Sequence, residues 1–334
     1  MCLYIGYKKP FVAKSDITVY KYVIKNEGKY YTACLCYKVN TNKVMKADKN
    51  GDIVLYNYNK YRIEGGAIHA CTTTFDNSFK YKVCLKAVIR KGTEFYIQDD
   101  LKNVAAKELY ITDEEVTDNR STDLTEYIED AIKNAESYND CVKVGYYRLS
   151  NGKFVNPFEY KEGTIIGVVA FFDTNGNPVS VGVKSGIIPW MKIPLINKVS
   201  SNIYDEDYVE DMDGMRHTKA ILSRKDYDPD NFVAVEYCNN YSTEGTNPGD
   251  WYMPAIGECL KITQNMLIIN MSLSKAGFDT FYLYSYLWSS STFSIFGDSY
   301  AWACNVPNGH CIWYDYGRVY SYYVCPCLAF IDKV

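Results

Sequence analysis

Cysteine is the residue type best able to do chemistry in this 334-residue chain, which contains 12 cysteines. None of them forms a Cys-x-x-Cys pair, and no cysteine cluster is matched by a pair of histidines, so the patterns of a zinc site are missing. The N-terminal residues have no charged segment followed by an apolar stretch and a cleavage site, so we predict no signal peptide. Thiols in a chain that is not exported stay reduced, and we expect these to be free and buried.

The acidic segment Asp205–Gly214 is the other candidate for chemistry. Its last four residues, Asp211–Gly214, have the Asp-x-Asp-Gly order of a calcium-binding loop, but no glutamate follows at the offset of the bidentate ligand. We therefore expect a solvated loop. His217 stands alone after it, which favours a structural role. No nucleophile can be paired with a base, so we predict no catalytic residue, no enzyme activity, no metal and no cofactor.

The residues before position 113 form a first predicted domain, 1–112. β-Branched and aromatic runs separated by polar turns predict strands in Ile17–Ile24 and in residues 29–39, 52–63 and 80–89. Leu101–Thr112 predicts a helix-like turn followed by a last short strand. We therefore expect a small α+β domain, with an anchoring or assembly role.

Residues 113–140 are predicted to connect this domain to a second one. Asp113–Asp123 is charged and poor in large apolar residues, which is typical of a linker. Apolar residues near helical spacing follow in Leu124–Tyr138, behind the candidate N-caps Thr122 and Asp123. We expect a connecting helix over Leu124–Tyr138.

The second predicted domain covers residues 141–334. Its first two runs are joined by Ser150-Asn151-Gly152, which predicts a hairpin, because Asn-Gly supplies the positive φ angles of a tight turn. Gly163–Asp173 predicts a buried strand. Gly257–Gly277 has helical periodicity with Gly277 as its C-terminal cap, and only short strands are expected after it.

Four motifs then occur in order in this second domain. They are GDWYMPAIGECLKI (Gly249–Ile262), YLWSSSTFS (Tyr286–Ser294), AWACNVPNG (Ala301–Gly309) and YYVCPCLAF (Tyr322–Phe330). The pattern resembles the formylglycine-generating-enzyme type of C-type lectin fold. It resembles more closely the variable proteins of diversity-generating retroelements in gut Bacteroides-like bacteria and their phages. The resemblance implies an α+β chain whose residues 141–334 are a C-type lectin fold that binds a ligand.

The closing strand departs from that family at two positions. Cys325 stands where an arginine is usual, and Cys327 stands where an apolar residue is usual. A buried ion pair made by that arginine is therefore absent.

The composition of the C-terminal segment fits this resemblance. Lys, Glu, Gln and Met together account for 55 of the 334 residues, yet none occurs among the 57 residues 276–332. Retroelements of this kind mutate template adenines, and an AAC codon changed at its adenines cannot encode Lys, Glu, Gln, Met or Trp. The resemblance thus implies a variable region at about 292–322. A plain lectin-like surface would explain the tyrosines, which strands favour, but not the missing Lys and Glu on solvated faces.

Tyrosine gives a large contact area at low entropy cost, while Ser, Gly, Asp and Asn adapt their hydrogen bonding, as in antibody loops. We expect ligand contacts from about half of the following positions, because side chains alternate along strands: Phe293, Ile295, Phe296, Tyr300, Val306, His310, Ile312, Tyr314, Asp315, Tyr316, Val319, Tyr320 and Tyr322. The expected scaffold beneath them consists of Trp251, Trp288, Trp302 and Trp313.

The expected partner is a protein or glycan on a bacterial cell surface. A net charge of −4 does not favour nucleic acid, and no apolar run is long enough to enter a membrane. A homo-oligomer would strengthen weak single sites through avidity. We expect synthesis in the cytoplasm, and association with a virion is one destination that the resemblance implies.

Two alternatives stay open. A non-diversified lectin-like adhesin would show the same fold without variation. An enzyme of the formylglycine-generating type would need two cysteines within disulfide reach; Cys304 and Cys311 could meet across a hairpin, whereas Cys325 and Cys327 are too close along one strand. Calcium-dependent sugar binding is not expected, because Val306–Asn308 has valine in place of the acidic ligand.

Overall fold

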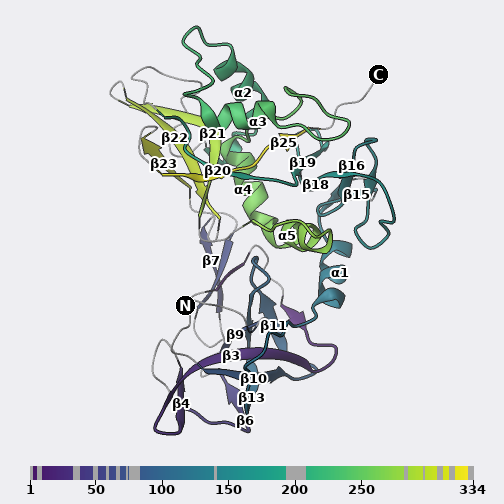
Figure 1. Cartoon of the computed structure of the whole chain (residues 1–334), viewed down its shortest axis with the longest axis vertical. Helices are drawn as coiled ribbons and strands as arrows, with labels where there is room; N and C mark the ends of the chain where they lie inside the picture. Colours follow the sequence, from purple (N-terminus) through teal and green to yellow (C-terminus); the bar gives the residue numbers. More distant parts are fainter. Residues whose placement is uncertain are drawn as a thin grey trace. The chain divides into compact units, whose positions relative to one another are not determined.

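The structure is a computed structural model (Figure 1) that describes residues 3–5, 10–32, 38–47, 52–57, 60–64, 68–72, 74, 83–138, 141–192, 208–281, 285–295, 298–306, 311–315 and 320–329. Helices occur together with mostly antiparallel strands, so the chain is α+β. It divides into two compact units. Unit 1 is Met1–Tyr56 with Lys60–Ile128, and unit 2 is Asn57–Asn59 with Glu129–Val334.

Unit 1 is built from strands. They are β1 (Leu3–Ile5), β2 (Phe11–Val12), β3 (Ile17–Asn26), β4 (Lys29–Thr32), β5 (Lys38–Val39), β6 (Lys43–Lys46), β7 (Asp52–Asn57), β8 (Lys60–Glu64), β9 (Ile68–Cys71), β10 (Val83–Ile89), β11 (Glu94–Ile97), β12 (Asn103–Ala106) and β13 (Glu108–Glu115). Within the described residues, β1, β8 and β7 form one sheet. A larger sheet has the order β2-β11-β12-β9-β3-β10-β13-β6, with β4 and β5 added beside β3.

The centre of the larger sheet is its most buried part. Val19 and Val23 of β3 are fully buried, and the neighbouring strand β10 buries Ala87 opposite Val19. Lys21 lies between the two valines on the same face and is partly exposed. Tyr20, on the opposite face, is also buried, so both faces of β3 contribute to the core of unit 1.

Leu101–Thr112 contains no helix-like turn, contrary to the sequence prediction. Asn103–Ala106 is strand β12, and Glu108–Glu115 is strand β13, which continues three residues into the predicted linker. Ala105 pairs with His69 in β9 and with Tyr96 in β11. Pairing on both sides outweighs the weak strand preference of alanine, because strand propensity depends on the neighbours.

The predicted connecting helix is present but shorter than expected. Helix α1 spans Thr125–Lys133, and the division between the two units falls within it. Its first turn is capped by Asp123, whose carboxylate accepts a hydrogen bond from the Thr125 backbone at 2.9 Å. Ser137–Tyr138, at the end of the predicted helix, is instead strand β14, paired with β15 (Val142–Lys143).

Unit 2 combines helices with two larger sheets in its described part. Its remaining elements are β16 (Tyr147–Leu149), β17 (Phe154–Val155), β18 (Ile165–Phe172), β19 (Pro178–Gly182), β20 (Gly186–Ile188), η2 (Tyr208–Glu210), α2 (Gly214–Leu222), α3 (Val233–Asn240), α4 (Ile256–Gln264), α5 (Met266–Lys275), β21 (Tyr286–Ile295), β22 (Asp298–Asn305), β23 (Cys311–Asp315), β24 (Tyr322–Val324) and β25 (Cys327–Leu328). The sheets have the orders β17-β16-β18-β19-β25 and β20-β24-β21-β22-β23.

The predicted hairpin and buried strand at the start of unit 2 are confirmed. β16 and β17 pair antiparallel across the turn, and Gly152 supplies the positive φ of 83°. β18 covers most of the predicted strand, and Ile166–Phe171 is a continuous run of buried residues within it. Consecutive residues are buried, so both faces of β18 are covered, which explains why its sequence is apolar throughout.

The predicted helix Gly257–Gly277 is two helices. α4 ends and α5 begins around Asn265, whose side-chain amide donates to the Ala170 carbonyl at 2.9 Å. The C-terminal cap is as predicted. Gly277 has φ 77°, its N–H donates to the Ser274 carbonyl, and the Phe278 N–H donates to the Leu273 carbonyl, which is the Schellman arrangement.

Helix α4 organises the core of unit 2, because it contacts β18 of one sheet and β21 and β22 of the other. Helices α2 and α3 pack on the second sheet, against β21 and against β20 and β24 respectively. Figure 1 shows β21, β22 and β23 side by side at the yellow end of the colour scale. None of the helices in the described residues is long and apolar enough to cross a membrane.

Candidate functional site

The sheet β20-β24-β21-β22-β23 holds most of the described residues of the predicted variable region. Tyr300 in β22 is the register partner of Phe293 in β21 and of Asp315 in β23. Three predicted contact positions, far apart in the sequence, are therefore neighbours across three strands. The other predicted contacts on strands of this sheet are Ile295, Ile312, Tyr314 and Tyr322.

The remaining predicted contacts lie in the connections between these strands. Val306 directly follows β22, and Tyr320 lies just before β24. Four positions fall outside the described residues: Phe296, His310, Tyr316 and Val319. For five others the structure describes the backbone alone: Phe293, Ile295, Ile312, Tyr314 and Asp315.

The exposures of the remaining four positions differ. Tyr320 is 54% exposed, and Tyr300 and Tyr322 are half-buried. Val306 is 1% exposed and belongs to the core cluster that contains Leu287. Its N–H donates to the Ser285 carbonyl at 3.0 Å, which holds the backbone against the start of β21. Val306 is therefore a core residue and cannot contact a ligand, which corrects the sequence prediction for this position.

An aromatic stack runs from the solvent into the core of this sheet. The Tyr320 and Tyr322 rings are stacked, with centroids 6.0 Å apart and an interplanar angle of 9°. Tyr322 also contacts Tyr286 at 4.9 Å and Trp288 at 4.8 Å. Pairs of this kind add to the stabilisation from burial. The exposed Tyr320 ring is thus the outer end of a stack whose inner end is a buried tryptophan.

The described tryptophans among the predicted scaffold residues are buried. Trp251, Trp288 and Trp302 are 1–2% exposed. Trp251 packs edge-on against Tyr241 at 4.7 Å, and its indole N–H donates to Thr246 at 3.0 Å. Trp313 is the register partner of Trp302, but only its backbone is described.

The motif around Trp251 builds a buried polar cluster at the start of α4. The Tyr252 hydroxyl donates to Glu258 Oε1 at 2.8 Å, and the Ala255 N–H donates to Glu258 Oε2 at 2.7 Å. Burial raises the pKa of Glu258 to about 8, and these hydrogen bonds oppose the rise only in part. Glu258 therefore closes the first turn of the helix from inside the core.

Asp211 extends this cluster, contrary to the solvated loop predicted for its segment. Its side chain is 5% exposed; the Ser291 hydroxyl donates to its carboxylate at 2.5 Å, and the Gly257 N–H donates to its carbonyl at 2.9 Å. His217 Nε2 lies 3.6 Å from the Asp211 carboxylate, and burial lowers the pKa of this histidine. The residues after η2 are thus fixed to α4 and β21. Asp205–Asp207 lie outside the described residues.

The described cysteines of unit 2 form no disulfide, and they are buried as predicted except Cys141, which is exposed. Cys304 and Cys311 are register partners in β22 and β23, and they are 0% and 8% exposed. Cys325 and Cys327 are also fully buried, on the connection between β24 and β25 and at the start of β25. No group of metal-ligating side chains occurs among the described residues.

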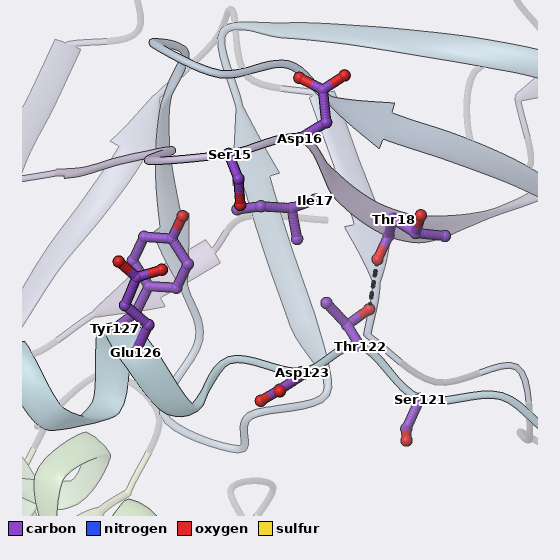
Figure 2. A pocket seen from close by; sticks show the side chains of 9 residues that line it. All are labelled: Ser15, Asp16, Ile17, Thr18, Ser121, Thr122, Asp123, Glu126 and Tyr127. Atoms are coloured by element: carbon purple, nitrogen blue, oxygen red, sulfur yellow. Dashed lines mark hydrogen bonds between the residues drawn. The ribbon is translucent and has the colours of Figure 1, made fainter.

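A separate hollow of about 340 Å³ lies in unit 1, between the start of β3 and the start of α1 (Figure 2). Its three carboxylates already have protein partners. Asp16 accepts from the Lys91 N–H at 2.8 Å, Asp123 caps α1, and Glu126 pairs with Lys14 at 3.0 Å. The dashed line in Figure 2 marks the hydrogen bond, 2.7 Å long, from the Thr122 hydroxyl to the Thr18 carbonyl. These contacts stabilise the start of β3 and the start of α1, so the residues that line the hollow have a structural role.

No known protein family, curated protein or solved structure matches the chain. Two residues that sequence reasoning did not assign belong to the candidate site. Tyr286 contacts Tyr322, and the indole N–H of the fully buried Trp190 donates to the Ser289 carbonyl at 2.8 Å. Trp190 follows β20 without a motif around it, so only its residue type could have indicated a core position.

Proposed function

We propose that the chain is a ligand-binding protein whose binding surface is the sheet β20-β24-β21-β22-β23 and the connections between its strands. The scaffold would be a C-type lectin fold of the kind displayed by retroelement variable proteins. The surface would be diversified at about residues 292–322 and would attach to a molecule on a bacterial surface. Binding, rather than catalysis, is the function.

The contrast between the large sheet of unit 1 and the sheet β20-β24-β21-β22-β23 carries the proposal. The sheet in unit 1 covers its solvated strand positions with Lys and Glu, which form the pairs Lys25–Glu115 (2.7 Å), Lys86–Glu114 (3.0 Å) and Lys107–Glu94 (2.5 Å). Residues 276–332, which include β21 to β25, contain no Lys and no Glu. Charged side chains are the ordinary way to keep a sheet soluble and unpaired. The strands of the sheet β17-β16-β18-β19-β25 also lack Lys and Glu, but most of their residues are buried. The observation that supports adenine mutagenesis is the absence of both residue types from all 57 residues of 276–332.

The physical properties of the described tyrosines also support a binding role. Tyr320 is exposed, and its ring is held by Tyr322, so little side-chain freedom is lost when a ligand covers it. Trp288 and Trp302 are buried beneath this surface, and we expect them to stay unchanged while the surface residues vary. A protein or a glycan on a cell surface fits such a mixture of aromatic and small polar side chains, and a homo-oligomer would add avidity.

An enzyme of the formylglycine-generating type is less well supported. Such an enzyme needs a thiol that a peptide substrate can reach. Cys304 and Cys311 lie opposite each other, but they are 0% and 8% exposed. Burial also raises the pKa of the Cys311 thiol, which lowers the fraction of the reactive thiolate at neutral pH.

Deep sequencing of the encoding locus and its flanks, from a growing population, tests the proposal. We expect substitutions concentrated in codons 292–322, opposite the adenines of a nearby template repeat. The codons of β3 and β18, which lie outside 292–322, are the internal control and should not vary. A locus without a template repeat and without excess variation would refute diversification and favour the plain adhesin.

A further inference from the structure

Cys304 and Cys311 occupy directly opposed positions in adjacent antiparallel strands. Opposed residues in such a ladder have Cα atoms about 4.5 or 5.5 Å apart, depending on the type of pair. Both distances lie within the range of about 4.4–6.8 Å that a disulfide bridges. Opposed side chains also leave the same face of the sheet, so the two Cβ atoms point the same way. The backbone of β22 and β23 thus already has the geometry of a cross-strand disulfide.

The surroundings of the two thiols differ in a way that sets an order of reaction. Cys304 is fully buried, and its Sγ lies 3.7 Å from the Thr263 hydroxyl of α4. Cys311 is 8% exposed, at the edge strand β23. The two thiols are within hydrogen-bonding reach of each other. A reagent from solution therefore meets Cys311 first, and Cys304 lies directly behind it.

We propose that Cys304 and Cys311 form a reversible disulfide that links β22 to β23. The site is independent of the proposed function, because it depends on strand register alone. The disulfide would join two strands that carry predicted ligand contacts, among them Tyr300 and Ile312.

The oxidant is a small-molecule disulfide, and the exchange balances without any other reactant. The Cys311 thiolate attacks one sulfur of the reagent, forms a mixed disulfide and expels the first reagent thiol. The Cys304 thiolate then attacks the Cys311 sulfur and expels the second reagent thiol. Two protein thiols are oxidised and one reagent disulfide is reduced, with the two thiol protons ending on the released thiols. Because burial raises the pKa of Cys311, the reaction should accelerate as the pH rises.

Neighbouring cysteines are less suited to this exchange. Cys259 is fully buried, and its Sγ lies 3.7 Å from the Trp288 carbonyl. Cys327 is also fully buried, and its Sγ lies 3.8 Å from the Cys325 carbonyl. Both thiols are thus less exposed than Cys311, so a reagent from solution should react with them more slowly.

The missing lysines make the test simple. Trypsin cuts after Lys275 and Arg318, so peptide 276–318 contains Cys304 and Cys311 as its only cysteines. Peptide 319–333 contains Cys325 and Cys327 and is the internal control. The folded full chain is incubated with bis(2-hydroxyethyl) disulfide, and the remaining thiols are alkylated. The chain is then digested with trypsin, and the masses of the peptides are measured by mass spectrometry. We expect peptide 276–318 to lose two hydrogen atoms and resist alkylation, while peptide 319–333 is alkylated twice.

Two variants check the order of events. Cys304→Ser should stop the reaction at the mixed disulfide, so that peptide 276–318 carries one reagent half on Cys311. Cys259→Ser should leave the disulfide unchanged. The melting temperature of each reduced variant shows whether it folds, and Cys304→Ala replaces Cys304→Ser if the serine variant does not fold.

Either of two results would overturn the proposal. One is full alkylation of Cys304 and Cys311 in the oxidant-treated, folded wild type. The other is a stable reagent adduct on wild-type Cys311, which would mean that the two sulfurs cannot meet. Neither result bears on diversification, which the sequencing experiment decides separately.

Discussion

The ring of Tyr322 lies 4.8 Å from the ring of Trp288, at an interplanar angle of 48°. One of these residues is a predicted ligand contact, and the other is a predicted scaffold residue. The contact means that the predicted variable region is not uniformly free to change. Tyr322 is half-buried against the core, whereas Tyr320, two residues before it, is 54% exposed.

Substitution along this aromatic stack should therefore cost more with depth. We expect Trp288→Ala to lower the free energy of unfolding by about 3–5 kcal/mol, because it empties a buried site. Tyr320→Ser should change it by less than about 0.5 kcal/mol, as for other exposed positions. Tyr322→Ser should fall between the two. Urea unfolding of the three variants measures the order, and equal costs for Tyr320→Ser and Trp288→Ala would contradict the stack.

Glu258 should make stability depend on pH. Its folded pKa of about 8 lies above the ordinary value of 4.5, so the contribution of this group is full below pH 4.5 and is lost as the pH rises towards 8. The free energy of unfolding should therefore fall with rising pH in this window, by up to about 1.4 kcal/mol per pH unit. Urea unfolding at several pH values measures the slope.

Glu258→Gln provides the control for that slope. Glutamine keeps the shape of the side chain and does not titrate, so the difference between wild type and variant isolates this one group. Tyr252→Phe should move the loss of stability to still higher pH, because the Tyr252 hydroxyl donates to the carboxylate and favours its charged form. A slope that is the same in wild type and Glu258→Gln would show that Glu258 is ionised in the folded state.

Arg148 should hold the last described strand in place. Its Nη1 donates to the carbonyls of Leu328 and Ala329 at 3.1 and 2.9 Å, and burial lowers its pKa only to about 10, so it stays charged. Arg148→Met would leave both carbonyls without this donor, at a cost of about 2–4 kcal/mol. The exposed Arg216, paired with Asp213, is the matched control, and Arg216→Met should cost less than about 1 kcal/mol.

Amide hydrogen exchange provides a second test of the Arg148 contact. If Arg148 fixes β25, the amide protons of Cys327 and Leu328 should exchange faster in Arg148→Met than in wild type, while those of β18 change less. Uniform acceleration throughout unit 2 would instead mean that the variant is only globally less stable.

Gly214 should not tolerate a side chain. A Cβ at this position would collide with the Glu258 carboxylate and would lie 2.6 Å from the Ala255 nitrogen. We expect Gly214→Ala to cost about 1–3 kcal/mol, because the start of α2 must move away from α4. Lys219→Ala, on the exposed side of the same helix, should change stability by less than about 0.5 kcal/mol. Equal thermal stability of the two variants would argue against the close approach.

Local signals were sufficient for part of the fold. The Asn-Gly turn before β17, the apolar run of β18 and the Gly277 cap each depend on residues within a few positions, and each was predicted. The break at Asn265 was missed, since it depends on a hydrogen bond to the Ala170 carbonyl, which is distant in the sequence. The same reason applies to β12, which owes its strand conformation to β9 and β11.

The candidate site was predictable by residue type but not by position. Composition indicated the segment, and alternation predicted that about half of its strand positions face solvent without showing which. It could not show that Val306 turns into the core, because this depends on the Ser285 carbonyl. It also could not show that Asp211 is buried, since an acidic segment predicts solvent unless a partner such as Ser291 is known.

The order of the strands has a consequence for synthesis. β24 completes one sheet beside β20 and β21, and β25 completes the other beside β19, with only Cys325 and Pro326 between them. The first sheet cannot close before residue 324 has left the ribosome, and the second cannot close before residue 328, so the newly made unit 2 must wait with open strand edges. In the proposed function, the altered codons lie just upstream of these closing strands. Folding would then select among variants. A variant protein whose altered segment prevents β24 and β25 from pairing would not complete its sheets and so would not display a binding surface.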